Sequence, residues 1–129
     1  MAKPSLVICE LPKEQEDMAR DVLSRVAGQW VLWVLYVLAN ATEPMRFTRV
    51  LEAVEGITQK VLTQTLRSLE RDGFVARTIY PQVPPRVEYE LTKLGRDLVD
   101  HVDPLVGWAR RHVAIFQTAQ RRFDRVSRK

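Results

Sequence analysis

The spacing of apolar residues predicts an amphipathic helix followed by a fully apolar one. Within residues 14–27, apolar side chains recur at steps of three and four residues: Met18, Val22, Leu23 and Val26. Residues 30–39 are apolar on every side, which indicates a central, buried helix. We expect this helix to end at Asn40 in a left-handed conformation, because Pro44 prevents its continuation.

Two further helices follow, and the second has one apolar and one polar face. Apolar positions within residues 47–54 predict a short helix that stops at Gly56. Thr58 is placed to cap the next helix with its hydroxyl group, and that helix runs to Asp72 before Gly73 ends it. Its apolar face carries Leu62, Leu66 and Leu69. At 100° per residue, the opposite face carries Lys60, Thr63, Gln64, Arg67 and Arg71.

The pattern then changes from a helical period to an alternating one. Residues 86–91 alternate between polar and apolar, as in a half-buried strand, and residues 74–80 form a β-rich partner. The connecting residues 81–85 include three prolines, so they cannot be regular strand. We therefore expect a β-hairpin with a stiff loop.

The C-terminal part predicts two helices separated by Pro104. Thr92 is placed to cap the first, which we expect to reach about His101. A last long helix carries an apolar stripe of Leu105, Trp108, His112, Phe116 and Phe123. So many aromatic residues favour a two-fold interface with a second copy of the chain. The alternative is that the stripe folds back onto its own domain.

The order of these elements is that of a winged helix-turn-helix. The fold class is therefore mainly α with a small two-stranded β-hairpin. In such folds the second helix enters the major groove of DNA, and its N-terminal part meets base edges. Glutamine can pair with adenine, arginine and lysine can reach guanine, and threonine can donate or accept. The candidates are Gln59, Lys60, Thr63, Gln64 and Arg67.

Other residues of this region are candidates for phosphate contacts. Lys60 and Arg71 could neutralise phosphates, and the backbone N–H groups at Thr58 could bind one. Arg86, at the tip of the hairpin, would meet the neighbouring groove or its backbone. It could instead pair with Glu88 or Glu90, although we expect same-strand neighbours to be poorly placed for this. The alternative for the helix is an ordinary solvated polar face.

The distribution of charge favours a polyanionic partner. The net charge of +4 comes from 20 basic and 16 acidic residues. Residues 110–129 carry seven bases and one acid, so the rest of the chain sums to −2. Residues 46–96 carry nine bases and six acids. A basic middle and a basic tail suit nucleic acid, although the tail alone is equally well explained as solvated.

Several classes of protein do not fit this sequence. The longest apolar run has ten residues, whereas a membrane-spanning helix needs about 20, so we expect a soluble cytoplasmic protein. One cysteine, Cys9, allows no intramolecular disulfide. His101 and His112 lack the spacing of metal ligands, and no phosphate-cradling loop occurs, so we expect no metal, no cofactor and no enzyme.

Three aromatic residues of the apolar segment recur at three-residue steps: Trp30, Trp33 and Tyr36. We interpret them as core residues. The alternative is that they line a pocket for a small-molecule effector near a dimer interface.

Five segments resemble the HxlR-type transcription regulators and extend over residues 28–108. They are Gly28-Gln29-Trp30, Arg46-Phe47, residues 56–73, residues 80–89 and Leu91-Thr92-Lys93-Leu94-Gly95. The resemblance implies a bacterial homodimer that binds palindromic operators and dimerises through its N- and C-terminal helices. The DNA-binding residues would be Arg46, Thr58, Gln59, Lys60, Thr63, Gln64, Arg67, Arg71 and Arg86. The dimer interface would include Met18, Val22, Trp108, His112 and Phe116.

Two residues depart from the family pattern. Many members carry a cysteine at or just before the first helix, about a dozen residues before the position of Trp30, and in some it senses electrophiles or oxidants. Cys9 lies about twenty residues before Trp30, so we do not expect it to have this role. Gln29 stands where lysine is common in the family.

We expect a single winged-helix domain over residues 1–129. It would comprise an arm (1–12), N-terminal helices (14–40), the helix-turn-helix and wing (46–91), and C-terminal dimerisation helices with a basic tail (92–129). The alternative function is a winged-helix module that binds protein without specific DNA binding.

Overall fold

A computed structural model describes residues 11–127 and contains six helices and three strands within them. In chain order these are α1 (Lys13–Val26), α2 (Val31–Asn40), β1 (Met45–Arg46), α3 (Phe47–Ala53), α4 (Gln59–Arg71), β2 (Val75–Tyr80), β3 (Arg86–Leu91), α5 (Lys93–Arg111) and α6 (Val113–Ser127). The predicted winged helix-turn-helix is confirmed. Cys9 and most of the predicted arm lie outside the described residues, as do the last two residues of the basic tail.

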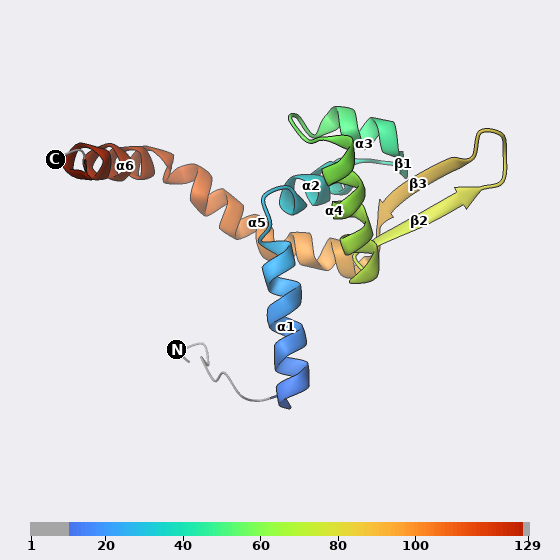
Figure 1. Ribbon diagram of the computed structural model, residues 1–129, viewed down its shortest axis with the longest axis horizontal. Helices are drawn as coiled ribbons and strands as arrows, with labels where there is room; N and C mark the ends of the chain where they lie inside the picture. The colour runs from blue at the N-terminus through green and yellow to red at the C-terminus, as the bar shows by residue number, and fades with distance from the viewer. Residues whose placement is uncertain (1–10, 128–129) are drawn as a thin grey trace.

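The body of the molecule is built around α2. Figure 1 shows α3, α4 and the sheet gathered about it, while α1, α6 and the β2–β3 hairpin extend outward. Burial of apolar surface explains this arrangement, since α2 and α4 each contribute three buried apolar side chains to one core: Val34, Leu35, Leu38, Leu62, Leu66 and Leu69. The central position predicted for residues 30–39 is confirmed.

The ends of α4 are fixed by local chemistry that the sequence predicted. The hydroxyl oxygen of Thr58 accepts a hydrogen bond from the backbone N–H of Val61 at 3.2 Å. Gly56 and Gly73 both have φ of +86°, a conformation that favours glycine, and they bound the turn before α4 and the end after it. The orientation of α4 therefore follows from its cap, its stop and its buried leucines.

Replacing Thr58 with alanine is expected to lower the stability of the fold by about 1 kcal/mol, because the helix loses its side-chain cap. Thermal unfolding followed by circular dichroism measures the effect. Thr58→Ser keeps a hydroxyl group and is the control. Equal melting temperatures for the two variants would contradict the role of the cap.

The sheet has three strands in the order β1-β3-β2, all antiparallel. The predicted hairpin is confirmed, with Val75 opposite Leu91 and Tyr80 opposite Arg86. The sheet also contains a third strand that the sequence did not predict, because β1 pairs with β3 on its other edge. A strand of two residues is too short to show the alternation by which strands are recognised.

The C-terminal helices are divided differently from the prediction. α5 does not end near His101 but continues through Pro104, and the hydroxyl of Tyr36 donates a hydrogen bond of 2.8 Å to Asp103 on that turn. The predicted single last helix is broken at His112. Nδ1 of His112 lies 2.7 Å from the carbonyl oxygen of Trp108. In a continuous helix, that carbonyl oxygen would accept a hydrogen bond from the backbone N–H of His112 instead.

The left-handed cap expected at Asn40 is also wrong. No residue other than glycine has a positive φ within residues 11–127, and the chain leaves α2 through an extended Ala41. The two glycines with positive φ, Gly56 and Gly73, lie in the turns before and after α4, whereas α2 ends without a residue of positive φ.

The Leu-Thr-x-Leu-Gly segment joins the end of α4 to the start of α5. The hydroxyl of Thr92 donates to the carbonyl oxygen of Gly73 at 2.6 Å and accepts from the N–H of Gly95 at 3.1 Å. A Cβ atom at Gly95 would clash with the carbonyl oxygen of Phe74. This segment therefore needs threonine and glycine for close packing of α5.

Within residues 11–127, no single helix is long and apolar enough to cross a membrane. α1 and α2 reach that length and composition only as a pair, bent by 76°.

Candidate nucleic-acid interface

The outer face of α4 is a continuous polar surface. Its buried leucines hold the helix on the core, and the side chains on the opposite side are exposed: Gln59, Lys60, Thr63, Gln64, Arg67 and Arg71. The structure thus brings together the residues that the sequence assigned to this face. We call these six residues the α4 outer face.

Two threonines at the start of α4 are engaged by the backbone. The Thr58 hydroxyl forms the helix cap, and the Thr63 hydroxyl donates to the carbonyl oxygen of Gln59 at 2.8 Å. Thr63 has therefore used its one O–H donor and keeps acceptor capacity only, whereas the Thr58 hydroxyl, which accepts, still has its O–H to donate. The donors of the α4 outer face are therefore its glutamine, lysine and arginine side chains.

The hairpin is tied to α4 by an ion pair that the sequence did not predict. Nε of Arg77, on β2, lies 3.3 Å from Oε1 of Glu70, on α4. The pair offsets the negative charge of Glu70 beside the basic residues of the α4 outer face. The alternation of residues 75–80 could have predicted that Arg77 lies on an outer face of the strand. It could not have predicted that Arg77 pairs with Glu70.

Arg86 does not extend freely from the tip of the hairpin. Its guanidinium lies 4.0 Å from the centre of the Tyr80 ring, and its Nε lies 3.6 Å from Oε2 of Glu88. The expectation that Glu88 is poorly placed to pair with it is wrong, because residues two apart on a strand share a face. Stacking on Tyr80 uses the face of the guanidinium, so it does not by itself prevent the N–H groups at its edge from contacting DNA.

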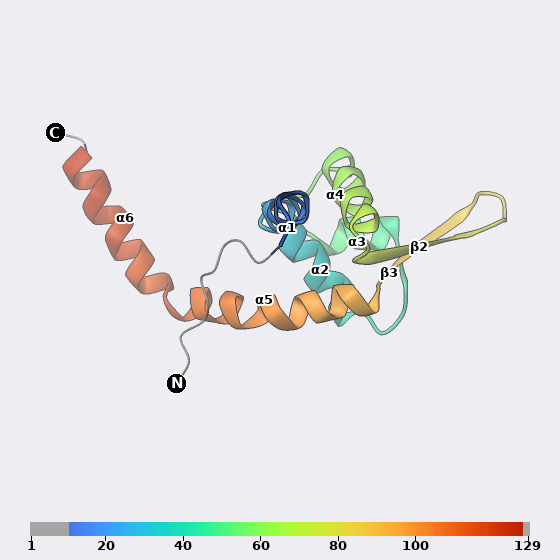
Figure 2. The same cartoon turned by 90° about the horizontal axis from the view of Figure 1, so that it is seen from below.

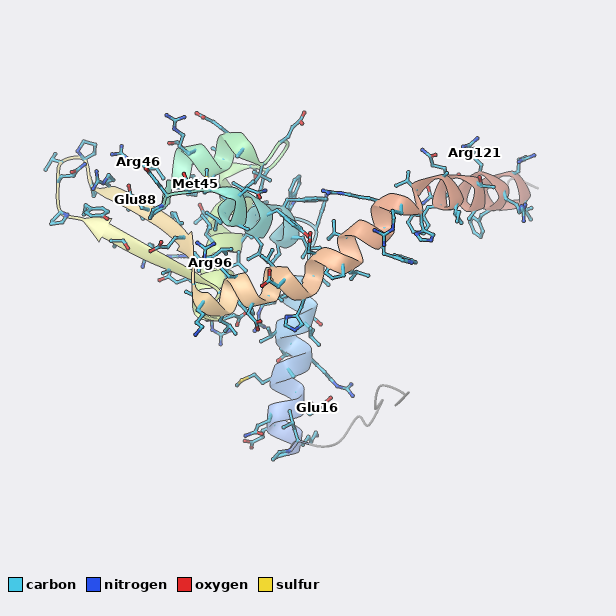
Figure 3. The ribbon with its side chains drawn as sticks, turned by 180° about the vertical axis from the view of Figure 1, so that it is seen from behind. Glu16, Met45, Arg46, Glu88, Arg96 and Arg121 are labelled. Atoms are coloured by element: carbon cyan, nitrogen blue, oxygen red, sulfur yellow. The ribbon has the colours of Figure 1, made fainter. Side chains whose placement is uncertain are left out.

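Arg46 is exposed at the edge of the sheet. It belongs to β1 and stands opposite Glu88 of β3 in the register. Figure 3 shows Arg46 and Glu88 side by side, as this register requires, and the carboxylate of Glu88 pairs with Arg86 of the same strand.

α1 is joined to the C-terminal end of α4 by a fork of two hydrogen bonds. Nε and Nη2 of Arg25 each donate to one carboxylate oxygen of Asp72, both at 2.8 Å. The hydrogen bond to Asp72 raises the pKa of Arg25, so the guanidinium stays charged. The two residues are 47 positions apart in sequence, and nothing in their local pattern predicted the contact. We call this pair the Arg25–Asp72 fork.

The residues predicted for a dimer interface lie on the two projecting arms. On α1, Met18 is 67% exposed while Val22 packs against the core. Near the α5–α6 break, the ring centres of Trp108 and His112 are 4.9 Å apart, and those of Trp108 and Phe116 are 5.7 Å apart.

The apolar stripe does not fold back onto its own domain. Within the described part of α6 no residue is buried, and Phe123 is 70% exposed. Figure 2 shows α6 turned away from the body, and Figure 3 shows Arg121 on the same arm, far from α4. The positive charge of this arm therefore lies apart from the α4 outer face.

The aromatic residues of α2 are less buried than expected. Trp30 packs against the core, but Trp33 is 45% exposed. Interpreting Trp33 as a core residue is therefore wrong.

The fold and the α4 outer face define a winged helix-turn-helix regulator, and comparison with known proteins gives its family. A model of the HxlR-like helix-turn-helix family matches residues 25–116. The chain belongs to this family, as the sequence segments indicated.

Its relatives carry consistent names. The chain is 40% identical over 90 residues to the HTH-type transcriptional regulator YtfH of Escherichia coli (strain K12), which covers 70% of each chain. It is 41% identical over 91 residues to the HTH-type transcriptional regulator YtcD of Bacillus subtilis (strain 168), covering 70% of this chain and 71% of that one. The solved structure of ytfH from Salmonella typhimurium matches with a TM-score of 0.72 and 32% identity, over 92% of this chain and 99% of that one.

This membership gives the coarse function. The protein is a transcriptional regulator with a DNA-binding helix-turn-helix, and its family consists of regulators rather than enzymes. Within residues 11–127, no group of three or more histidine, cysteine, aspartate or glutamate side chains could hold a metal ion.

Proposed function

We propose that the protein acts as a homodimer on a palindromic operator, with α4 of each copy in the major groove. The observation that carries this proposal is the α4 outer face, six exposed polar residues on a helix fixed by its buried leucines. A rigid support is needed for side chains that distinguish bases. Two-fold symmetry then requires half-sites about one helical turn apart.

Within this proposal, the residues divide between two kinds of contact. Gln59, Thr63, Gln64 and Arg67 read base edges, because their groups match those presented in the major groove. The remaining candidates bind phosphates, which position the protein without specifying sequence: Arg46, Thr58, Lys60, Arg71 and Arg86.

The second copy of the chain would cover the projecting arms. α6 has no buried residue and carries exposed apolar side chains, among them Ile115 and Phe123. Exposed apolar surface of this extent marks an interaction surface in soluble proteins. The proposed interface residues are Met18, Val22, Trp108, His112 and Phe116. An isologous contact between two copies would cover the apolar surface of both arms in each copy.

The whole chain, residues 1–129, would work as one winged-helix unit with these arms attached. The named relatives are bacterial, and a regulator of bacterial genes acts on DNA in the cytoplasm. A small-molecule effector would modulate such a regulator.

One experiment tests operator recognition and separates it from the alternative function. Purified protein is incubated with fragmented genomic DNA at near-physiological salt, and the bound fragments are sequenced. We expect enrichment of a few sites that share a palindrome. Even, salt-sensitive recovery of all fragments would mean backbone binding alone. No recovery would favour a winged-helix module that binds protein.

The oligomeric state has its own measurement. Light scattering after size-exclusion chromatography is expected to give twice the chain mass of 14.9 kDa. A monomer at micromolar concentration would contradict the proposed interface while leaving the α4 outer face untouched.

A further inference from the structure

A cavity of about 310 Å³ lies between α2 and the segment that follows α3. On one side it is lined by the aromatic rings of α2: Trp30, Trp33 and Tyr36. On the other side lie Val54 and Glu55, directly before the turn at Gly56. The volume is at the lower end of the range for ligand pockets, so it suits a small molecule.

The lining is mainly aromatic and apolar, with Asn40 as one uncharged polar residue. The ring centres of Trp33 and Tyr36 are 6.5 Å apart. The Tyr36 hydroxyl is donated to Asp103, so the polar end of this ring is already satisfied. Burial, and next the hydrogen bond to Asp103, raise the pKa of Tyr36, so the phenol remains neutral. Neutral aromatic faces attract cations through their quadrupole.

The charge at the cavity has the same preference. Glu55 is the single charged residue of the lining, it is exposed, and it has no ion-pair partner among residues 11–127. Asp103 and Arg110, whose charges act on Tyr36, belong to α5 and oppose each other there. An organic cation would therefore meet aromatic rings and an unpaired carboxylate, whereas an anion would be repelled by the carboxylate.

We propose that this cavity binds a small organic cation, an ammonium group carried on a flat apolar body. Its walls are connected to the DNA-reading helix. Cη2 of Trp30 lies 3.5 Å from the position that a Cβ of Gly56 would occupy, and Gly56 forms the turn before α4. A ligand that stacks on Trp30 and pairs with Glu55 holds this turn from both sides. The binding site stands independently of operator recognition, but this coupling rests on the proposed function.

Three probes of nearly equal shape test the site on the full chain without DNA. Benzylamine is a cation at pH 7, benzyl alcohol is neutral and benzoate is an anion. Ligand-observed NMR and intrinsic tryptophan fluorescence are expected to show benzylamine binding about fivefold more tightly than benzyl alcohol, because of the cation–π and carboxylate attraction. Benzoate is expected to bind most weakly. Equal affinities for benzylamine and benzyl alcohol, or no saturable binding, would overturn the site.

Variants assign the preference to named side chains. Glu55→Gln is expected to remove the preference for benzylamine over benzyl alcohol, and Trp33→Ala to weaken both probes. Glu52→Gln is the matched control, because Glu52 is an exposed carboxylate of α3 that does not line the cavity. Equal behaviour of the two glutamine variants would overturn the role of Glu55.

The coupling is tested with a fragment recovered in the genomic selection. Saturating benzylamine is expected to change the affinity for that fragment, and the fragment must change benzylamine affinity by the same factor. An unchanged DNA affinity with intact benzylamine binding would overturn the coupling alone. Failure of the genomic selection would overturn operator recognition. The cation site in the cavity would then still be decided by the binding measurements with the three probes.

Discussion

Replacing Arg67 with alanine is expected to weaken binding to a selected operator by about ten- to one-hundred-fold for each half-site. Arg67 is exposed on the α4 outer face, and its guanidinium can donate two hydrogen bonds to one guanine. Loss of that pair also relaxes discrimination at one position of the half-site. Competition with operators that carry every single-base change measures both effects.

Lys60 provides the contrast, because a phosphate contact carries no sequence information. Lys60→Ala is expected to weaken binding to all DNA sequences by the same factor. It is also expected to lower the slope of the logarithm of the binding constant against the logarithm of salt concentration, by about one released ion per protomer. Arg96→Ala is the control, since Arg96 is an exposed cation at the start of α5 (Figure 3). If Arg67→Ala behaved like Lys60→Ala, Arg67 would contact the backbone rather than a base.

Helix α4 was predictable because its determinants are local. The hydroxyl cap at Thr58, the glycine at position 73 and the three-and-four spacing of leucines all act within a few residues. The polar face followed from the same rotation. Short-range chemistry thus located the α4 outer face from sequence alone.

The divisions of the C-terminal helices depended on distant contacts. Proline inside a helix costs a hydrogen bond, so the sequence predicted a break at Pro104. α5 nevertheless continues, and Tyr36 of α2 bonds the turn that carries Asp103. The break instead falls at His112, whose ring bonds a carbonyl of its own helix, and that side-chain orientation is not encoded in any spacing.

The site residues that the sequence missed are paired charges. Arg77 meets Glu70 and Arg25 meets Asp72 only after the chain has folded. For Arg86 the error was one of strand geometry, since the side chains of residues 86 and 88 lie on the same face. Sequence therefore supplied the list of exposed cations but not their partners.

The Arg25–Asp72 fork bears directly on how two copies would be spaced on DNA. Within residues 11–127, α1 makes no other side-chain hydrogen bond or ion pair to the body, and its remaining anchor is apolar packing around Val26. Figure 1 shows α1 leaving the body beside α4. A carboxylate near a helix C-terminus is unfavourable for the helix itself, so Asp72 depends on Arg25.

Asp72→Ala is therefore expected to lower the melting temperature by a few degrees and to broaden the preferred spacing between half-sites. The proposed dimerisation arm would no longer be held at a fixed angle to α4. Selection from a library of half-sites with variable spacers measures the breadth. Arg20→Ala is the matched control, because it breaks only the exposed Glu16–Arg20 pair within α1.

Reversing the charges distinguishes the fork from general destabilisation. The double variant Arg25→Asp with Asp72→Arg is expected to recover part of the melting temperature and to narrow the spacer preference again, since either order of charges can pair across the same gap. Sharp spacing in Asp72→Ala would mean that packing around Val26 alone orients α1. Broad spacing in the double variant as well would mean that the native orientation depends on the two-bond geometry of arginine on aspartate at these positions.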